Sequence, residues 1–124
     1  MGEGIRREIC QLVNNSHGLT FHKLVIRDTC LFDEFCDEVA KSKKDMKCLT
    51  AIISRMGSFG DNLVPKKYFR QLKDIGRSDI FEFKQDNLRV YVQLVKPDVV
   101  ILLGGTKNSQ TKDIRKIKRI ISYI

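Results

Sequence analysis

Apolar residues in this chain follow two different spacings, and these spacings predict the order of the elements. Three short segments, at about 79–84, 88–95 and 98–103, are rich in Val, Ile, Leu and Phe and are separated by short polar turns. Such segments are typical of antiparallel strands. An earlier segment at 19–27 is rich in β-branched and aromatic residues, so it is predicted to be a first strand.

Helical spacing marks three other segments. Residues 31–41 repeat apolar side chains every three or four positions and carry acidic residues on the opposite face. A second helix is predicted after residues 42–44 and runs to about 56, and the short connection between the two indicates an antiparallel hairpin. A third helix, at about 110–123, combines an isoleucine stripe with lysines and arginines. The glycine pair at 104–105 is predicted to be the turn that ends the last strand.

Two further segments complete the expected organisation of the chain. Residues 3–14 also show helical spacing of isoleucine, leucine and valine, so a short N-terminal helix or an arm is predicted as an accessory element. Residues 61–79 are expected to be mostly loop. We therefore predict an N-terminal helical extension at 1–18 and one domain at 19–124. The fold class is α+β, with an antiparallel-dominated sheet packed on a helical hairpin and flanked by N- and C-terminal helices.

Composition favours a folded, basic domain. A hydrophobic fraction of 42% among 124 residues supports a core, and the longest apolar run is too short to span a membrane. The opening residues lack the pattern of a secretory leader, so none is expected. The net charge is +8, and the last third holds nine Lys and Arg against three Asp. This excess is compatible with nucleic acid, an anionic membrane surface or an acidic protein as the partner.

The cysteines and histidines do not predict a metal site. No pair of cysteines forms CxxC, and His17 and His22 are not at zinc-ligand spacing from any cysteine. We therefore expect no metal and no small-molecule cofactor, and four reduced thiols fit a cytoplasmic protein. The cysteines are Cys10, Cys30, Cys36 and Cys48.

Alternation within two of the predicted strands places polar side chains on one surface. Glu82 and Lys84 share a face of the first strand, and Arg89 and Tyr91 share a face of the next. Neighbouring strands can therefore present all four residues together.

A second group of cations lies in the predicted loop, where Lys66, Lys67 and Arg70 surround Tyr68 and Phe69. Aromatic rings interleaved with cations can stack on RNA bases and neutralise phosphates. The same aromatic side chains could instead seal the edge of the sheet. The sequence leaves both interpretations open.

The predicted order β-α-α-β-β-β, followed by a basic helix, resembles the RelE/HigB/ParE toxin superfamily, and its HigB-like, phage-derived branch most closely. The resemblance spans about residues 20–124. It is carried by four stretches, which are IFEFK at 80–84, LRVYVQL at 88–94, VVILLGGTKNSQTKD at 99–113 and IRKIKRI at 114–120.

The resemblance implies a toxin of a type II toxin-antitoxin system that cleaves mRNA on the ribosome. Members of the family mostly act without a metal, through attack of the 2′-hydroxyl on the adjacent phosphate to leave a 2′,3′-cyclic phosphate. The implied partners are a helix-turn-helix antitoxin, the ribosome and mRNA. No membrane partner is implied.

The resemblance also implies roles for particular residues. Arg89 and Lys107 would stabilise the charged phosphorane, Lys84 or Glu82 would act as the base, and Tyr91 would position the substrate. Five more cations are candidates for RNA contacts, of which the resemblance implies only the lysine at 112, and the residue pattern of the loop and the last helix suggests the others. These are Lys112, Lys66, Lys67, Arg70 and Arg115.

The chain departs from the family in one respect, because some members use histidines near the site and no histidine follows His22. Any acid would then be Lys, Tyr or Glu. Two alternatives therefore stay open beside the nuclease. One is a non-catalytic toxin of the same fold, such as a ParE-like gyrase inhibitor, or an inactive phage-derived nucleic-acid-binding protein. The other is a basic adaptor that binds RNA or protein.

Overall fold

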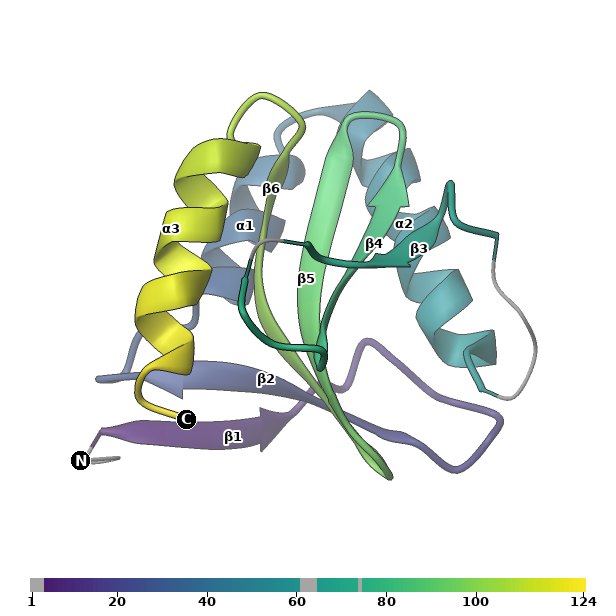
Figure 1. Cartoon of the computed structure of the whole chain (residues 1–124). Helices are drawn as coiled ribbons and strands as arrows, with labels where there is room; N and C mark the ends of the chain where they lie inside the picture. Colours follow the sequence, from purple (N-terminus) through teal and green to yellow (C-terminus); the bar gives the residue numbers. More distant parts are fainter. Residues whose placement is uncertain (1–3, 61–64, 74) are drawn as a thin grey trace.

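The computed structural model describes residues 4–60, 65–73 and 75–124, and its six strands form one mixed sheet (Figure 1). The strand order across the sheet is β1-β2-β6-β5-β4-β3. In chain order the elements are β1 (Ile5–Ile9), β2 (Thr20–Ile26), α1 (Leu31–Val39), α2 (Lys43–Ser58), β3 (Phe69–Gln71), β4 (Ile80–Gln85), β5 (Leu88–Val95), β6 (Asp98–Thr106) and α3 (Gln110–Ile121).

The α+β class predicted from the sequence is confirmed at this level. β2 pairs in parallel with β6, and the other neighbouring strands pair antiparallel. The strands predicted at 19–27, 79–84 and 88–95 correspond closely to β2, β4 and β5. All three helices predicted after residue 30 are also present.

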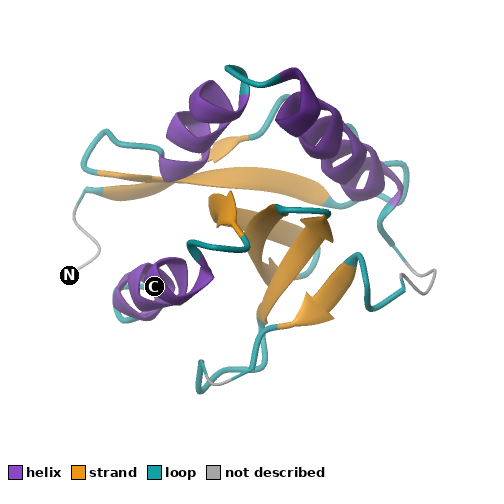
Figure 2. Cartoon of the chain, turned by 90° about the horizontal axis from the view of Figure 1, so that it is seen from above, coloured by secondary structure: helices purple, strands orange, loops and turns teal. Residues whose placement is uncertain are grey.

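Helices cover both faces of the sheet. α1 and α2 lie over one face, and α3 lies over the other (Figure 2). Each face carries its own buried cluster, one centred on Phe32, Ile52 and Phe83, the other on Leu24 and Ile117. The two-sided cover explains why β5 is buried along most of its length.

The prediction of an N-terminal helix is wrong, because Ile5–Ile9 forms β1 and joins the sheet beside β2. Ile5 and Ile9 are four residues apart, and this spacing fits one face of a strand as well as one face of a helix. The register with β2 places Ile5 opposite Ile26 and Ile9 opposite His22. Pairing with a distant strand therefore decided between the two structures.

The segment predicted as loop contains the short strand β3, which pairs with β4. Phe69 opens this strand, and its ring lies 4.6 Å from Phe83, 4.8 Å from Phe59 and 5.0 Å from Phe81 between centroids. Phe69 therefore seals the edge of the sheet, as one of the two interpretations expects. Residues 61–64 and 74 of the same segment lie outside the described residues.

The glycine pair does not end the last strand, because β6 continues through it to Thr106. Side chains approach this part of β6 from both layers. A Cβ on Gly104 would collide with the ring of Phe35 from α1, and a Cβ on Gly105 would collide with the carboxylate of Asp113 from α3. The glycines are therefore required for close packing rather than for a turn.

The described part of the chain contains four free thiols and no group of His, Cys, Asp or Glu placed to hold a metal ion. Within the same residues, none of the helices has the length and apolar character needed to cross a bilayer.

Replacing Gly104 with alanine is expected to lower the free energy of unfolding by about 1–3 kcal/mol, because the added methyl group would displace Phe35. Urea denaturation followed by circular dichroism measures the change. The matched control is the double variant Phe35→Ala, Gly104→Ala, whose loss should be smaller than the sum of the two single losses. An additive result would show that the two residues do not compete for this space.

Candidate nucleic-acid interface

The polar residues predicted to share one surface lie side by side on the sheet face covered by α3. The register of β4 and β5 places Glu82 opposite Tyr91 and Lys84 opposite Arg89. The register of β3 and β4 adds Arg70, which lies opposite Glu82. Side chains opposite one another in a sheet point to the same face, so three strands contribute to this group.

Glu82 is the centre of the group, and it has no exposed surface. Its Oε2 accepts a hydrogen bond from Nε of Arg70, and its Oε1 accepts one from Nε2 of Gln110 at 2.9 Å. Nε of Arg89 lies 3.8 Å from Oε1. A buried carboxylate is costly unless donors and cations surround it, and these three side chains meet that requirement.

Arg89 is held on two sides. Its Nη1 donates hydrogen bonds to the backbone carbonyls of Asp86 at 2.7 Å and Leu88 at 2.9 Å. The residue is 9% exposed, and its Nε has no hydrogen-bond partner among the described residues. Arg89 therefore connects Glu82 to the turn between β4 and β5.

The pKa values of Lys84 and Tyr91 are both shifted from their usual values. Burial lowers the pKa of Lys84 below the usual 10.5, and the nearby charges of Arg70 and Arg89 lower it further, against the opposing effect of Glu82. Burial raises the pKa of Tyr91, so its hydroxyl stays protonated at neutral pH. That hydroxyl is buried beside Gln110 and has no hydrogen-bond partner in the described part of the chain.

The N-terminus of α3 is fixed to the end of β6, which positions Gln110. Oγ of Ser109 donates to Oδ2 of Asp113 at 2.6 Å and accepts from the backbone N–H of Thr106 at 2.9 Å. Asp113 packs directly on Gly105. Gln110 and Asp113 are not among the site residues predicted from the sequence. One signal could have indicated Gln110: Glu82 lies within a predicted strand, and a buried glutamate there needs hydrogen-bond donors.

The remaining predicted cations come from three different parts of the chain. Lys107 is exposed, and its backbone N–H donates to the carbonyl of Asn87 at 2.8 Å, which places it at the end of the sheet where Lys84 and Arg89 pair. Lys112 and Arg115 are exposed on α3.

Lys66 and Lys67 precede β3 along the sheet edge and are exposed. Nζ of Lys67 lies 4.9 Å from the ring centroid of Tyr68, and the guanidinium carbon of Arg55 lies 3.5 Å from the same centroid. The backbone N–H of Lys84 donates to the carbonyl of Tyr68 at 2.7 Å, so this segment borders the cation group.

Beside the cation group is a depression of about 180 Å³. It is lined by Arg70, Gln71, Leu72, Lys73, Gln110 and Ile114.

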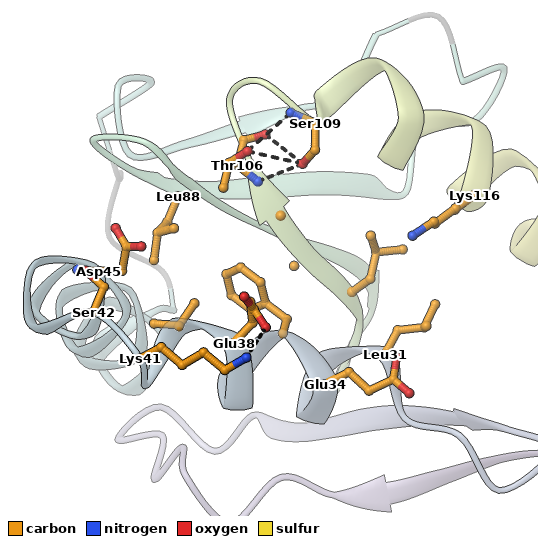
Figure 3. Close-up of a pocket in the computed structure, with 15 residues that line it drawn as sticks. Leu31, Glu34, Glu38, Lys41, Ser42, Asp45, Leu88, Thr106, Ser109 and Lys116 are labelled. Carbon is orange, nitrogen blue, oxygen red and sulfur yellow. Dashed lines mark hydrogen bonds and ion pairs between the residues drawn. The ribbon is translucent and has the colours of Figure 1, made fainter.

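A larger groove, of about 590 Å³, lies between α1, β6 and α3 (Figure 3). It contains none of the predicted site residues. Its lining includes the acids Glu34, Glu38 and Asp45, against the cations Lys41 and Lys116. A polyanion would therefore bind less favourably there than at the Arg70–Lys84–Arg89 face.

Comparisons of the chain with family models, with curated proteins and with solved structures give no match. The geometry by itself defines a basic α+β protein with a buried carboxylate that organises cations on one sheet face. Such a face can bind a phosphate diester and stabilise added negative charge on it.

Removing the Glu82 carboxylate is expected to destabilise the protein. Glu82→Ala leaves Arg89 buried without its counter-charge, so the free energy of unfolding should fall by about 3–5 kcal/mol in chemical denaturation. The matched control is Glu38→Ala, because Glu38 pairs with Lys41 at 3.0 Å on the surface. That variant should lose less than about 1 kcal/mol. Equal losses would contradict the anchoring role of Glu82.

The pKa of Lys84 provides a second test of the group. Arg70→Ala removes a nearby positive charge, so the pKa of Lys84 should rise toward 10.5. NMR titration of the lysine side-chain resonances measures the shift. Lys67→Ala is the matched control and should leave the pKa unchanged, whereas an unchanged value in Arg70→Ala would contradict the electrostatic description.

Proposed function

We propose that this protein is a metal-independent endoribonuclease of the RelE/HigB type, the toxin of a type II toxin-antitoxin pair. The observation that carries the proposal is the cross-strand pair of Lys84 and Arg89, which share one sheet face with Arg70 and lie around the carboxylate of Glu82. The element order β2-α1-α2-β4-β5-β6 and the parallel pairing of β2 with β6 support a RelE-like arrangement, in which β1 and β3 are additions.

The reaction needs a base, cations and a proton donor. Lys84 has a lowered pKa and is partly exposed, so its neutral amine would take the proton from the 2′-hydroxyl. The 2′ oxygen then attacks the adjacent phosphorus, and the bond to the 5′ oxygen breaks. Arg70 and Lys107 are exposed and would stabilise the phosphorane, and protonated Lys107 would donate a proton to the leaving oxygen.

Burial suggests different roles for the other predicted residues. Glu82 and Tyr91 have no exposed surface, and Arg89 has little. In this proposal they position Arg70 and Lys84 and do not contact RNA directly. Lys66, Lys67, Lys112 and Arg115 are exposed and would bind flanking phosphates.

The setting of the reaction follows from the same proposal. The substrate is mRNA in the ribosomal A site, so the protein acts in the cytoplasm. Its neutralising partner is a helix-turn-helix antitoxin. The net charge of +8 supports association with ribosomal RNA and with an acidic partner.

Variants of exposed cations test the proposal. Lys84→Ala and Arg70→Ala should each slow mRNA cleavage by about 10²–10³, measured with purified protein and translating ribosomes. Lys47→Ala removes an exposed cation from α2, on the opposite face of the sheet, and should cleave at the original rate. Cleavage at the original rate in all three variants would remove the proposed site.

The pH dependence of cleavage tests the role of Lys84. A neutral amine is required, so the rate should rise with pH by up to about tenfold per unit below the pKa of Lys84, which lies under 10.5. The pH at which this rise levels off marks the pKa, so Arg70→Ala, which raises that pKa, should move the levelling-off to higher pH. Single-turnover cleavage from about pH 6 upward, followed until each rate levels off, measures both profiles. A levelling-off at the same pH in both proteins would exclude Lys84 as the base.

One observation favours a non-catalytic protein of the same fold. Arg89, the predicted phosphate ligand, is buried and bonded to the carbonyls of the β4–β5 turn. A gyrase inhibitor of the ParE type could use the same basic face for binding alone. Induced expression separates the two functions, because the nuclease cuts translated messages whereas a gyrase inhibitor stops growth with messages intact and DNA supercoiling altered.

A further inference from the structure

β1 is an outer strand of the sheet, and no described residue pairs with its free edge (Figure 1). It is five residues long, whereas the strand at the opposite edge, β3, has three. Ile9 in this strand is 56% exposed. An open edge of this kind can pair with another strand unless the sequence prevents it.

The backbone groups that face outward can be assigned from the pairing with β2. The carbonyl of Gly4 accepts from the N–H of Arg27 at 2.6 Å, and the N–H of Cys10 donates to the carbonyl of Phe21 at 2.9 Å. In an antiparallel strand, alternate residues bond to opposite neighbours. The even-numbered positions therefore bond to β2, and the N–H and C=O groups of Ile5, Arg7 and Ile9 point to the free edge.

The side chains of β1 are complementary to those of an antiparallel copy centred on Arg7. Such pairing places Ile5 opposite Ile9 and Arg6 opposite Glu8. Arg6 and Glu8 already lie together on one face, with Nη2 of Arg6 2.9 Å from Oε2 of Glu8, and both remain partly exposed. The second copy would add two reciprocal ion pairs there and would cover Ile9 on the other face.

Other symmetric registers are less favourable. Centring the pair on Arg6 places two copies of that arginine opposite each other and sets Ile5 against Arg7. Centring it on Glu8 opposes two carboxylates. In the Arg7-centred register the two central arginines meet, but Oδ2 of Asp98 lies 3.9 Å from Nη1 of Arg7 in each copy and offsets their repulsion.

We propose that β1 pairs antiparallel with β1 of a second copy of this chain, about a two-fold axis at Arg7, to form one continuous sheet. We choose this chain itself as the occupant of the edge because β1 is complementary to its own reversed sequence: in the antiparallel pair, Arg6 of each copy lies opposite Glu8 of the other. The candidate site lies toward the far edge of the sheet, at β3, β4 and β5, so both sites of the dimer remain open. The inference does not depend on the proposed function.

Sedimentation equilibrium of the full chain measures the association directly. The mass should rise from 14.3 kDa toward twice that value as protein concentration increases. Over the same range, the amides of Ile5, Arg7 and Ile9 should become protected from hydrogen exchange. A mass of 14.3 kDa at every concentration would overturn the proposal, and so would a dimer whose three amides stay unprotected.

Two variants locate the interface. Arg7→Pro removes an outward N–H that β2 does not use, so the chain should keep its circular dichroism spectrum and lose the dimer. Glu8→Lys replaces the carboxylate opposite Arg6 with a cation at both symmetric positions of the dimer. The resulting repulsion should weaken dimerisation by at least about tenfold.

The charge swap Arg6→Glu, Glu8→Lys restores opposite charges across the pair when it is made together with Asp28→Asn, because Oδ1 of Asp28 lies 3.1 Å from Nη1 of Arg6 in the same chain. This variant should recover the dimer, which a role of either residue in folding alone would not produce. An unchanged dimer in both Arg7→Pro and Glu8→Lys would overturn the proposal, as would failure of the charge swap to recover the association.

Discussion

A carboxylate with no access to water must be surrounded by hydrogen-bond donors and cations, and in this protein that requirement falls on Glu82. Its partners come from three other elements, with Arg70 on β3, Arg89 on β5 and Gln110 on α3. The edge strand, the central strand and the last helix are thus tied to one side chain. The arrangement of cations on this face is a consequence of that buried charge.

The cluster separates into a buried part and an exposed part. Glu82, Tyr91 and Arg89 are enclosed, whereas Arg70 and Lys107 are exposed and Lys84 is partly so. A rigid interior that positions exposed cations is the arrangement expected where negative charge has to be stabilised without reorganisation of the protein. It also accounts for the perturbed pKa of Lys84, which lies between a desolvating interior and two guanidinium groups.

Much of this fold could be predicted from the sequence because the signals are local. Alternation predicts that Lys84 and Arg89 share a face, and helical spacing predicts the helices. β1 could not be predicted, because the spacing of Ile5 and Ile9 fits two structures and a strand distant in sequence selects one.

The roles of Gly105 and Gln110 also depend on non-local contacts, since both are set by how α3 packs on β6 and β4. Sequence patterns likewise indicate that a residue is polar without revealing whether it is buried. That is why Arg89 and Glu82 are expected at a reactive surface and are found beneath it.

The most direct test of the proposed nuclease activity is the chemistry of the RNA ends in messages incubated with purified protein and translating ribosomes. Attack by a neighbouring 2′-hydroxyl, with lysine and arginine side chains supplying the base and the cations, leaves a 2′,3′-cyclic phosphate and a 5′-hydroxyl. We predict those ends on every fragment. Fragments with 3′-hydroxyl and 5′-phosphate ends, or intact messages, would contradict the account.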